Sequence, residues 1–300
     1  MQRYRAYIDL TLAMFISGSA VVVSKNMVTS LPTFLATELG ILIGMIILIP
    51  FTFLIKKCEW RYDVRTHSVM FAQAFCGVFL YRTFTFVGLK FTSAASGGLI
   101  TSAGPVLVLL LAYFILKERV TARQLIAIIC TVIGILMVNF TSFASSGDPG
   151  SLKGNLFIMA AVLCEALFSI LSKVECRPVS ALCRTTIIVI YAFLLLLPFS
   201  VHDVINYDFR LLNVETILCV SYYGVFVTFL SYVFWFRGIA LTSAGNAAVF
   251  TSVVPISSVL LSVLLLHEKL LPLHIVSMGF ILTGIWVSCA SKKSAPVAAQ

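Results

Sequence analysis

This sequence has little charge for its length. Only 11% of its 300 residues are charged, and it contains 12 acidic residues and four histidines. With 60% hydrophobic residues and a mean hydropathy of +1.05, it has too few polar side chains to cover an apolar interior in water. The composition therefore excludes a soluble globular protein and indicates a protein embedded in a bilayer.

The sequence patterns of several other classes are also missing. Barrel strands would alternate polar and apolar residues, whereas this chain has apolar runs of about 20 residues, the length of a membrane-spanning helix. The eight cysteines form no Cys-x-x-Cys pair, and His267-Glu268 lacks the second histidine of a zinc motif. We expect no metal and no cofactor. Despite the net charge of +9, we also expect no nucleic-acid partner, because basic loops beside membrane spans account for it.

A membrane-embedded enzyme is the alternative from another functional class. Such an enzyme needs acidic or histidine side chains that converge at a membrane face. Only His202-Asp203 and Asp208 approach this pattern, and they lie on one loop without partners. The sequence therefore predicts that the protein is not an enzyme.

A segment in the first half of the chain recurs 150 positions later. Residues 88–118 read GLKFTSAASGGLITSAGPVLVLLLAYFILKE, and residues 238–268 read GIALTSAGNAAVFTSVVPISSVLLSVLLLHE. The same offset aligns Pro105 with Pro255 and Glu118 with Glu268, together with two Thr-Ser pairs. Apolar composition alone would not align these residues, so the chain contains an internal duplication.

The apolar runs predict ten membrane spans, five in each half. Their ranges are 7–28, 32–55, 68–89, 93–116, 123–140, 155–173, 179–199, 214–236, 243–266 and 273–291. We expect a first repeat over residues 1–140, an external linker over 141–154, a second repeat over 155–291 and a cytoplasmic tail over 292–300. Because five is odd, the second copy crosses the membrane with opposite polarity, as in many secondary transporters. The predicted fold is an all-α membrane protein of two inverted five-helix repeats.

The basic residues between the spans favour one orientation. Most lie on the side of the N-terminus, whereas only Lys90, Lys153, Arg210 and Lys269 lie on the opposite side. Loops rich in Lys and Arg stay in the cytoplasm. We therefore expect a multi-pass protein of the plasma or inner membrane with both termini inside the cell.

Pro105 and Pro255 lie near the middle of spans 4 and 9. Proline cannot donate to the carbonyl four residues earlier, and in hydrocarbon that carbonyl needs another partner. One interpretation is a packing kink satisfied by neighbouring hydroxyl groups. The other is a helix break at a binding site, which the symmetric depth of the two prolines favours.

Charged residues inside spans are costly, so each needs an explanation. Glu38 in span 2 and Arg82 in span 3 lie at similar depth, and we expect them to form a buried ion pair. Arg184 takes the position of Glu38 in the second repeat. Glu165 lies near the centre of span 6 with no charged neighbour in sequence. It is a candidate for proton coupling or for holding a cationic group; the alternative is a neutral carboxyl group bonded to a neighbouring helix.

Several of these segments resemble one known family. SGSAVVVSK in span 1, Leu31-Pro32 before span 2 and both copies of the repeated segment are similar to the EamA branch of the drug/metabolite transporter superfamily, and the resemblance covers residues 7–291. It implies a ten-helix carrier, monomer or homodimer, that exports amino acids or other small metabolites by alternating access. Its partners would be a small-molecule substrate, the bilayer and, as a candidate coupling ion, the proton. The alternative is uptake of a nucleotide-like or sulfonium metabolite, or efflux of cationic drugs.

The resemblance also implies a central cavity formed mainly by spans 1, 3, 4, 6, 8 and 9. Carried over to this chain, the substrate-binding residues are Lys25, Tyr81, Arg82, Ser96, Thr101, Glu165, Tyr232, Trp235, Asn246 and Thr251. Glu38 departs from the family, which commonly has Arg early in span 2. A fixed cation at Arg82 favours a solute with a carboxylate or phosphate group, unless Glu38 neutralises it.

Overall fold

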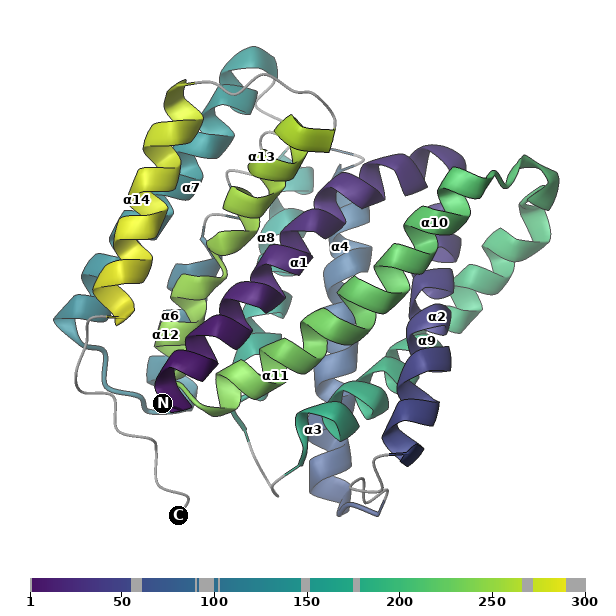
Figure 1. Ribbon diagram of the computed structural model, residues 1–300, viewed down its shortest axis with the longest axis horizontal. Helices are drawn as coiled ribbons and strands as arrows, with labels where there is room; N and C mark the ends of the chain where they lie inside the picture. The colour runs from purple at the N-terminus through teal and green to yellow at the C-terminus, as the bar shows by residue number, and fades with distance from the viewer. Residues whose placement is uncertain are drawn as a thin grey trace.

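The computed structural model describes residues 2–54, 61–89, 91, 100–101, 103–146, 152–174, 179–265 and 272–289. All regular elements in these ranges are helices, which confirms the predicted all-α fold (Figure 1). The first half contains α1 (Gln2–Ser30), α2 (Thr33–Leu54), α3 (Val64–Ala74), η1 (Phe75–Leu80), α4 (Tyr81–Leu89), α6 (Gly104–Ile115) and α7 (Ala122–Ser146). The second contains α8 (Leu152–Leu171), α9 (Ala181–Asn206), η2 (Phe209–Leu211), α10 (Val214–Tyr222), η3 (Tyr223–Ser231), α11 (Tyr232–Ala240), α12 (Ala244–Phe250), α13 (Val253–Leu265) and α14 (Pro272–Cys289).

These helices account for the ten expected spans. α3, η1 and α4 follow one another directly and form span 3, and α10, η3 and α11 form span 8 in the same way. α12 and α13 are the two parts of span 9, and α6 is the second part of span 4, whose residues 92–99 lie outside the described ranges. α1, α2, α7, α8, α9 and α14 each form one span.

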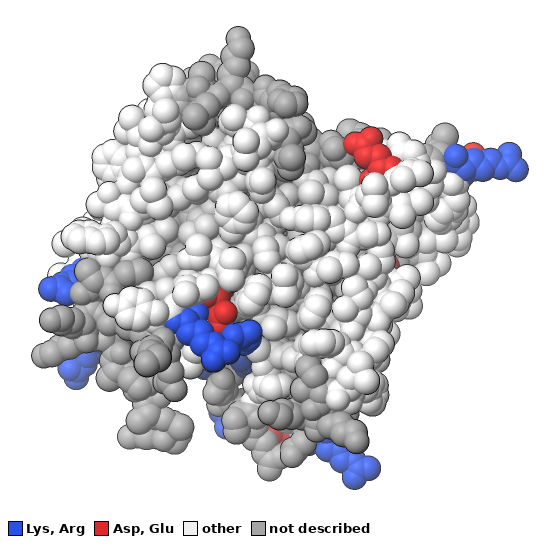
Figure 2. Space-filling view, in the orientation of Figure 1, with Lys and Arg blue, Asp and Glu red and all other residues white. Residues whose placement is uncertain are grey.

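The surface of the bundle suits a bilayer. α2, α8, α9, the continuous helix Val214–Ala240 and the segment Ala244–Leu261 are each long and apolar enough to cross a membrane. Figure 2 shows a broad uncharged area over the upper left and centre of one face, while the visible Lys, Arg, Asp and Glu residues lie at the upper right, at the left edge and below the centre. Phe114 and Trp286 are each 70% exposed, and in a membrane protein such side chains contact lipid chains. The chain is therefore an all-α membrane protein.

The two ends of the bundle are distinct in Figure 1. We call the end with the turn between α1 and α2 the Leu31 end, and the end with the N-terminus the Glu118 end. At the Leu31 end, the Tyr207 hydroxyl donates to the Ser30 carbonyl at 2.9 Å. This bond fixes the last carbonyl of α1 to the segment that follows α9.

Spans 3 and 8 share an unusual backbone feature at equivalent positions. η1, which begins at Phe75, and η3, which begins at Tyr223, are both π-helical. A π-helical turn widens the backbone and commonly occurs at functional sites. Its presence in both halves agrees with the duplication, and Gly77-Val78-Phe79 in η1 matches Gly224-Val225-Phe226 in η3.

The two repeats interlock through equivalent glycine contacts. A Cβ atom added to Gly88 of α4 would lie 3.2 Å from the Gly154 carbonyl of α8. A Cβ atom added to Gly238 of α11 would lie 3.1 Å from the Ala6 carbonyl of α1. Span 3 of the first repeat therefore packs on span 6 of the second, while span 8 of the second packs on span 1 of the first. This exchange is what a two-fold relation between inverted copies requires.

α7 and α14, the last spans of the two repeats, pack closely against each other. A Cβ atom added to Gly134 would lie 2.8 Å from the Ser277 carbonyl, and one added to Gly284 would lie 2.7 Å from the Ala127 carbonyl. Each glycine thus meets the backbone of the other helix at a position related by the same offset. Small residues allow this close approach of membrane helices.

The prolines of spans 4 and 9 lie just after breaks in the helix. α12 ends at Phe250 and α13 begins at Val253, so Pro255 falls in the first turn of α13, and Pro105 is likewise the second residue of α6. Proline is tolerated there because first-turn N–H groups have no helical partner. At the break in span 9, the Thr251 hydroxyl donates to the Ala248 carbonyl at 2.7 Å. The Thr251 carbonyl, which Pro255 leaves without its helical donor, accepts the Val254 N–H at 3.1 Å.

Candidate functional site

A cavity of about 370 Å³ lies inside the bundle, between the two repeats. Its walls come from α1, α2, η1 and α4 of the first repeat and from α8, α9, η3, α11 and the break before α13 of the second. Small-molecule pockets typically have volumes of about 300–1,000 Å³. A small solute in this cavity would touch both repeats at once.

Six of the expected binding residues line the cavity. They are Tyr81, Arg82, Glu165, Tyr232, Trp235 and Thr251. Within the described part of the wall, the charged side chains are Arg82 and Glu165. The cavity therefore presents one cation and one anion among aromatic, hydroxyl and apolar groups.

The other expected binding residues do not belong to the described wall. Asn246 is buried in α12, where its Oδ1 accepts hydrogen bonds from Gln124 Nε2 and Ser288 Oγ, both at 3.3 Å. Thr101 lies just before α6 and is also absent from the described wall. Ser96 and the side chain of Lys25 lie outside the described residues. The structure thus gives Asn246 a role in packing between α7, α12 and α14.

Arg82 is held at the wall by two neutral partners. Its Nη1 donates to Thr37 Oγ1 at 3.1 Å, and its Nη2 donates to the Tyr223 hydroxyl. The guanidinium carbon lies 5.3 Å from the centre of the Tyr223 ring, within reach of a cation–π interaction. Because neither partner carries a negative charge, the positive charge of Arg82 remains available to a solute.

The expected ion pair between Glu38 and Arg82 is wrong. Arg82 bonds to Thr37 and Tyr223 instead, and among the described residues neither carboxylate oxygen of Glu38 has a hydrogen-bond partner. The reason is the period of α2, since consecutive side chains on a helix point about 100° apart. Thr37 lines the cavity, whereas Glu38 is only 6% exposed and lies outside the wall.

Glu165 lies on α8 and is exposed to the cavity. Tyr81 and Tyr232 line the same cavity. Phe168, one turn further along α8, packs edge-on against Tyr232 with ring centres 5.9 Å apart. Glu165 has no ion pair within the described residues, so its carboxyl group faces the cavity in a largely aromatic setting.

Sequence reasoning missed the polar groups that shape the wall around Arg82. Thr37 and Tyr223 hold its guanidinium group, and Ser17 of α1 lies 2.9 Å from Ser231 of η3, oxygen to oxygen. These residues carry no charge; Ser17 opens the SGSAVVVSK segment, whereas Thr37, Tyr223 and Ser231 belong to none of the matched motifs. Tyr223 begins the π-helical segment η3, and only the backbone reveals this feature.

The Glu118 side of the cavity is closed by contacts between α1 and the second repeat. Tyr7 stacks on Phe250, with ring centres 5.1 Å apart, and Phe250 is 1% exposed. Arg237 Nε lies 3.4 Å from Asp9 Oδ2. Toward the Leu31 end, by contrast, the wall extends as far as Met27 and Thr33 (the first residue of α2). Within its described lining, the cavity therefore extends toward the Leu31 end.

The repeated glutamate has a structural role at the closed end. Glu118 accepts hydrogen bonds from the N–H groups of Ala244, at 3.2 Å, and Gly245, at 3.5 Å. These are the first residues of α12, where unpaired N–H groups and the helix dipole favour a negative charge. Glu118 of the first repeat thus caps a helix of the second. Its counterpart Glu268 lies outside the described residues.

This chain is similar to known proteins in sequence and in fold. The EamA-like transporter family matches it twice, over residues 5–140 and 152–289. The uncharacterized transporter YetK of Bacillus subtilis is 35% identical over 289 residues, which cover 96% of this chain and 88% of YetK. The uncharacterized transporter YyaM of the same organism is 27% identical over 219 residues, or 73% of this chain and 71% of YyaM. One solved crystal structure has a TM-score of 0.80 at 18% identity over 95% of this chain and 97% of that chain, which shows the shared fold.

Proposed function

Because this chain belongs to the EamA-like transporter family, we propose that it is a secondary transporter that moves an amino-acid-like zwitterion across the cytoplasmic membrane by alternating access. One observation carries the choice of solute. The cavity between the repeats presents Arg82 and Glu165 from opposite halves of the chain. A free amino acid bears one carboxylate and one ammonium group, so it matches this pair of charges.

Each charge suits one end of such a solute. The guanidinium group of Arg82 is a planar fork of N–H donors, the geometry that binds a carboxylate with two parallel hydrogen bonds. Glu165 accepts hydrogen bonds and attracts an ammonium group, and the rings of Tyr81 and Tyr232 in the same cavity favour a cation further. Apolar wall residues such as Met14, Val78 and Ile188 suit the side chain of the solute.

The arrangement of the two ends supports alternating access. The cavity extends toward the Leu31 end, while Tyr7, Phe250 and the Asp9–Arg237 ion pair close the Glu118 end. Inverted repeats can exchange their conformations, which yields a second state with the opposite end open. The excess of basic residues on the N-terminal side favours a cytoplasmic Glu118 end and thus an outward-facing cavity in this conformation. Net export is the direction that we propose.

The proposal is tested by binding to the purified protein. The ligands are an amino acid, the amine that lacks its carboxylate and the acid that lacks its ammonium group. We expect Arg82→Gln to weaken binding of the amino acid about 10- to 100-fold, the effect of losing a charged hydrogen bond of about 1.5–3 kcal/mol, and to leave the amine unaffected. Glu165→Gln should weaken binding of the amino acid and leave binding of the acid unchanged.

The controls are Arg210→Gln and Glu215→Gln, which remove exposed charges near the Leu31 end. They should not change the affinity for any of the three ligands. Equal binding of the amine and the amino acid by the wild type would contradict the zwitterion and favour a cationic substrate. The aromatic surroundings of Glu165 are the observation that supports this second candidate, which includes sulfonium metabolites and cationic drugs. Tighter binding of the acid alone would contradict both.

A further inference from the structure

Glu38 is a buried acidic residue that the binding of a zwitterion does not use. It lies in the second turn of α2, is 6% exposed and stands outside the cavity wall. Neither carboxylate oxygen has a hydrogen-bond partner among the described residues. An ionised carboxylate without a partner in an apolar interior costs several kcal/mol or more, and such a group normally becomes neutral instead.

The second repeat shows what the equivalent position does when it is well partnered. Arg184 of α9 corresponds to Glu38, and its guanidinium group donates to the Ser172 carbonyl at 2.9 Å and to the Val174 carbonyl at 3.2 Å. α8 ends at Leu171, so Arg184 satisfies carbonyl groups just beyond the end of that helix. An arginine is suited to this position because it has only donors.

In the first repeat, both the donor and the acceptor of this contact are missing. Ser24, which precedes Lys25 as Ser172 precedes Lys173 in the second repeat, lies inside α1. Because α1 continues as a helix to Ser30, the backbone there bonds within the helix. A carboxylate has no N–H to offer to a carbonyl group in any case. Glu38 therefore has neither the donor chemistry of Arg184 nor an exposed helix end to cap.

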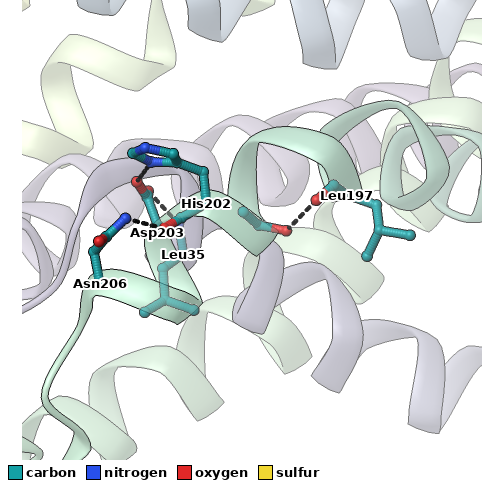
Figure 3. A network of polar contacts seen from close by, with 6 residues as sticks. Leu35, Leu197, His202, Asp203 and Asn206 are labelled. Atoms are coloured by element: carbon teal, nitrogen blue, oxygen red, sulfur yellow. Dashed lines mark hydrogen bonds and ion pairs between the residues drawn. The ribbon is translucent and has the colours of Figure 1, made fainter.

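Among the described residues, no charged or titratable group around this part of α2 forms a hydrogen bond with Glu38. Asp203 accepts the Leu35 N–H at 3.3 Å and lies beside His202, with 3.8 Å between its Oδ1 and His202 Nδ1 (Figure 3). Tyr222 bonds to Ser19 at 2.7 Å. Cys219 on α10 and Tyr223 on η3 also lie on helices packed here, and Arg82 lies across the cavity. The side chain of Lys25 on α1 lies outside the described residues.

We propose that Glu38 is the proton-binding site of this transporter and that its carboxyl group is protonated in the present conformation. After Glu38 releases this proton, the Arg82 guanidinium group would be the counter-ion of its carboxylate. Arg82 already bonds to Thr37, the residue that precedes Glu38, so a shift of the Leu31 end of α2 would bring the Glu38 carboxylate toward the guanidinium group. The proton would pass to water, and the new carboxylate would compete with the solute carboxylate for Arg82. The solute would therefore bind only while Glu38 holds its proton, so that one proton would leave the cell with each exported solute, a consequence that rests on the zwitterion transport proposed above.

The proton on Glu38 can be tested without any substrate. Infrared spectra of the purified protein at neutral pH should show the C=O stretch of a buried carboxylic acid, and this band should shift in D₂O. Glu38→Gln should remove the band, whereas Glu165→Gln should retain it. Glu38→Met, a second variant with an apolar side chain of similar length, should also lack the band and should fold, because it replaces a neutral group. A band that survives in both Glu38 variants would overturn the proposal.

The coupling is tested in proteoliposomes. Glu38→Gln should retain exchange of labelled amino acid across the membrane but lose its acceleration by a pH gradient, since glutamine cannot release a proton. Glu165→Gln should weaken exchange and keep its response to the gradient. The opposite assignment of the two effects would overturn the role of Glu38. If the wild type exchanges no amino acid, the proposed substrate fails, and the infrared result still decides whether Glu38 holds a proton.

Discussion

The contact between α7 and α14 provides a sharp test of the inverted packing. Replacing Gly134 by Ala would place a Cβ atom 2.6 Å from Ile281 Cγ1 and 2.8 Å from the Ser277 carbonyl oxygen. The isoleucine side chain can rotate, but the carbonyl belongs to the backbone of α14 and cannot move alone. Overpacking of this kind typically costs about 1–3 kcal/mol. We therefore expect Gly134→Ala to lower the free energy of unfolding by that amount.

The second repeat and α14 itself provide matched comparisons. Gly284→Ala should be destabilising to a similar extent, because its added Cβ atom would lie 2.7 Å from the Ala127 carbonyl oxygen. Gly279→Ala makes the same chemical change on α14 at a place where no atom lies within 4 Å of the new Cβ. There the better helix propensity of alanine should leave stability unchanged or raise it by up to about 1 kcal/mol.

The measurement is unfolding in mixed micelles at increasing SDS fraction, followed by far-ultraviolet circular dichroism. The three variants should separate into two destabilised proteins and one that matches or exceeds the wild type. If Gly134→Ala and Gly279→Ala behave alike, α7 and α14 do not pack as described. A large difference between Gly134→Ala and Gly284→Ala would argue against the two-fold relation between the repeats.

Three further perturbations test other parts of the packing. Glu118→Ala removes the acceptor for two N–H groups of α12 and should cost about 1–3 kcal/mol, measured by the same SDS titration. Arg237→Gln leaves the buried Asp9 carboxylate without its cation and should lower the free energy of unfolding by about 1–3 kcal/mol. Adding Asp9→Asn to this variant should restore part of the lost stability. A double variant that loses as much stability as the two single variants combined would refute the ion pair. Arg184→Met should destabilise the protein, whereas Glu38→Met should not, and equal losses would show that the two positions are used alike.

Much of the fold followed from the sequence because membrane insertion leaves few options. Apolar runs long enough to span a membrane as helices determined the number of spans, since backbone groups in lipid must be bonded within a helix. The matched pair Pro105 and Pro255 indicated two equivalent helix breaks, and the breaks in α12–α13 and before α6 lie beside them. The π-helical segments were not predictable, because no local sequence pattern distinguishes them from ordinary helix.

The site was predictable in its composition but not in its geometry. Arg82 and Glu165 stood out because charge inside a membrane is rare and expensive. The residues around them did not, because Thr37 and Tyr223 matter only through the face of the helix on which they lie. The wrong pairing of Glu38 with Arg82 has the same origin, since depth in the membrane is readable from sequence but rotation about the helix axis is not.

The sequence by itself determined that this chain is a duplicated, helical membrane protein, because apolar length and a fixed repeat offset are properties of residue order alone. The tertiary structure decided which polar groups share a cavity, which helices of one repeat pack on the other and that Glu38 lies apart from Arg82. Those outcomes depend on how each helix is rotated and where its backbone breaks, and these are set by packing between segments far apart in the chain.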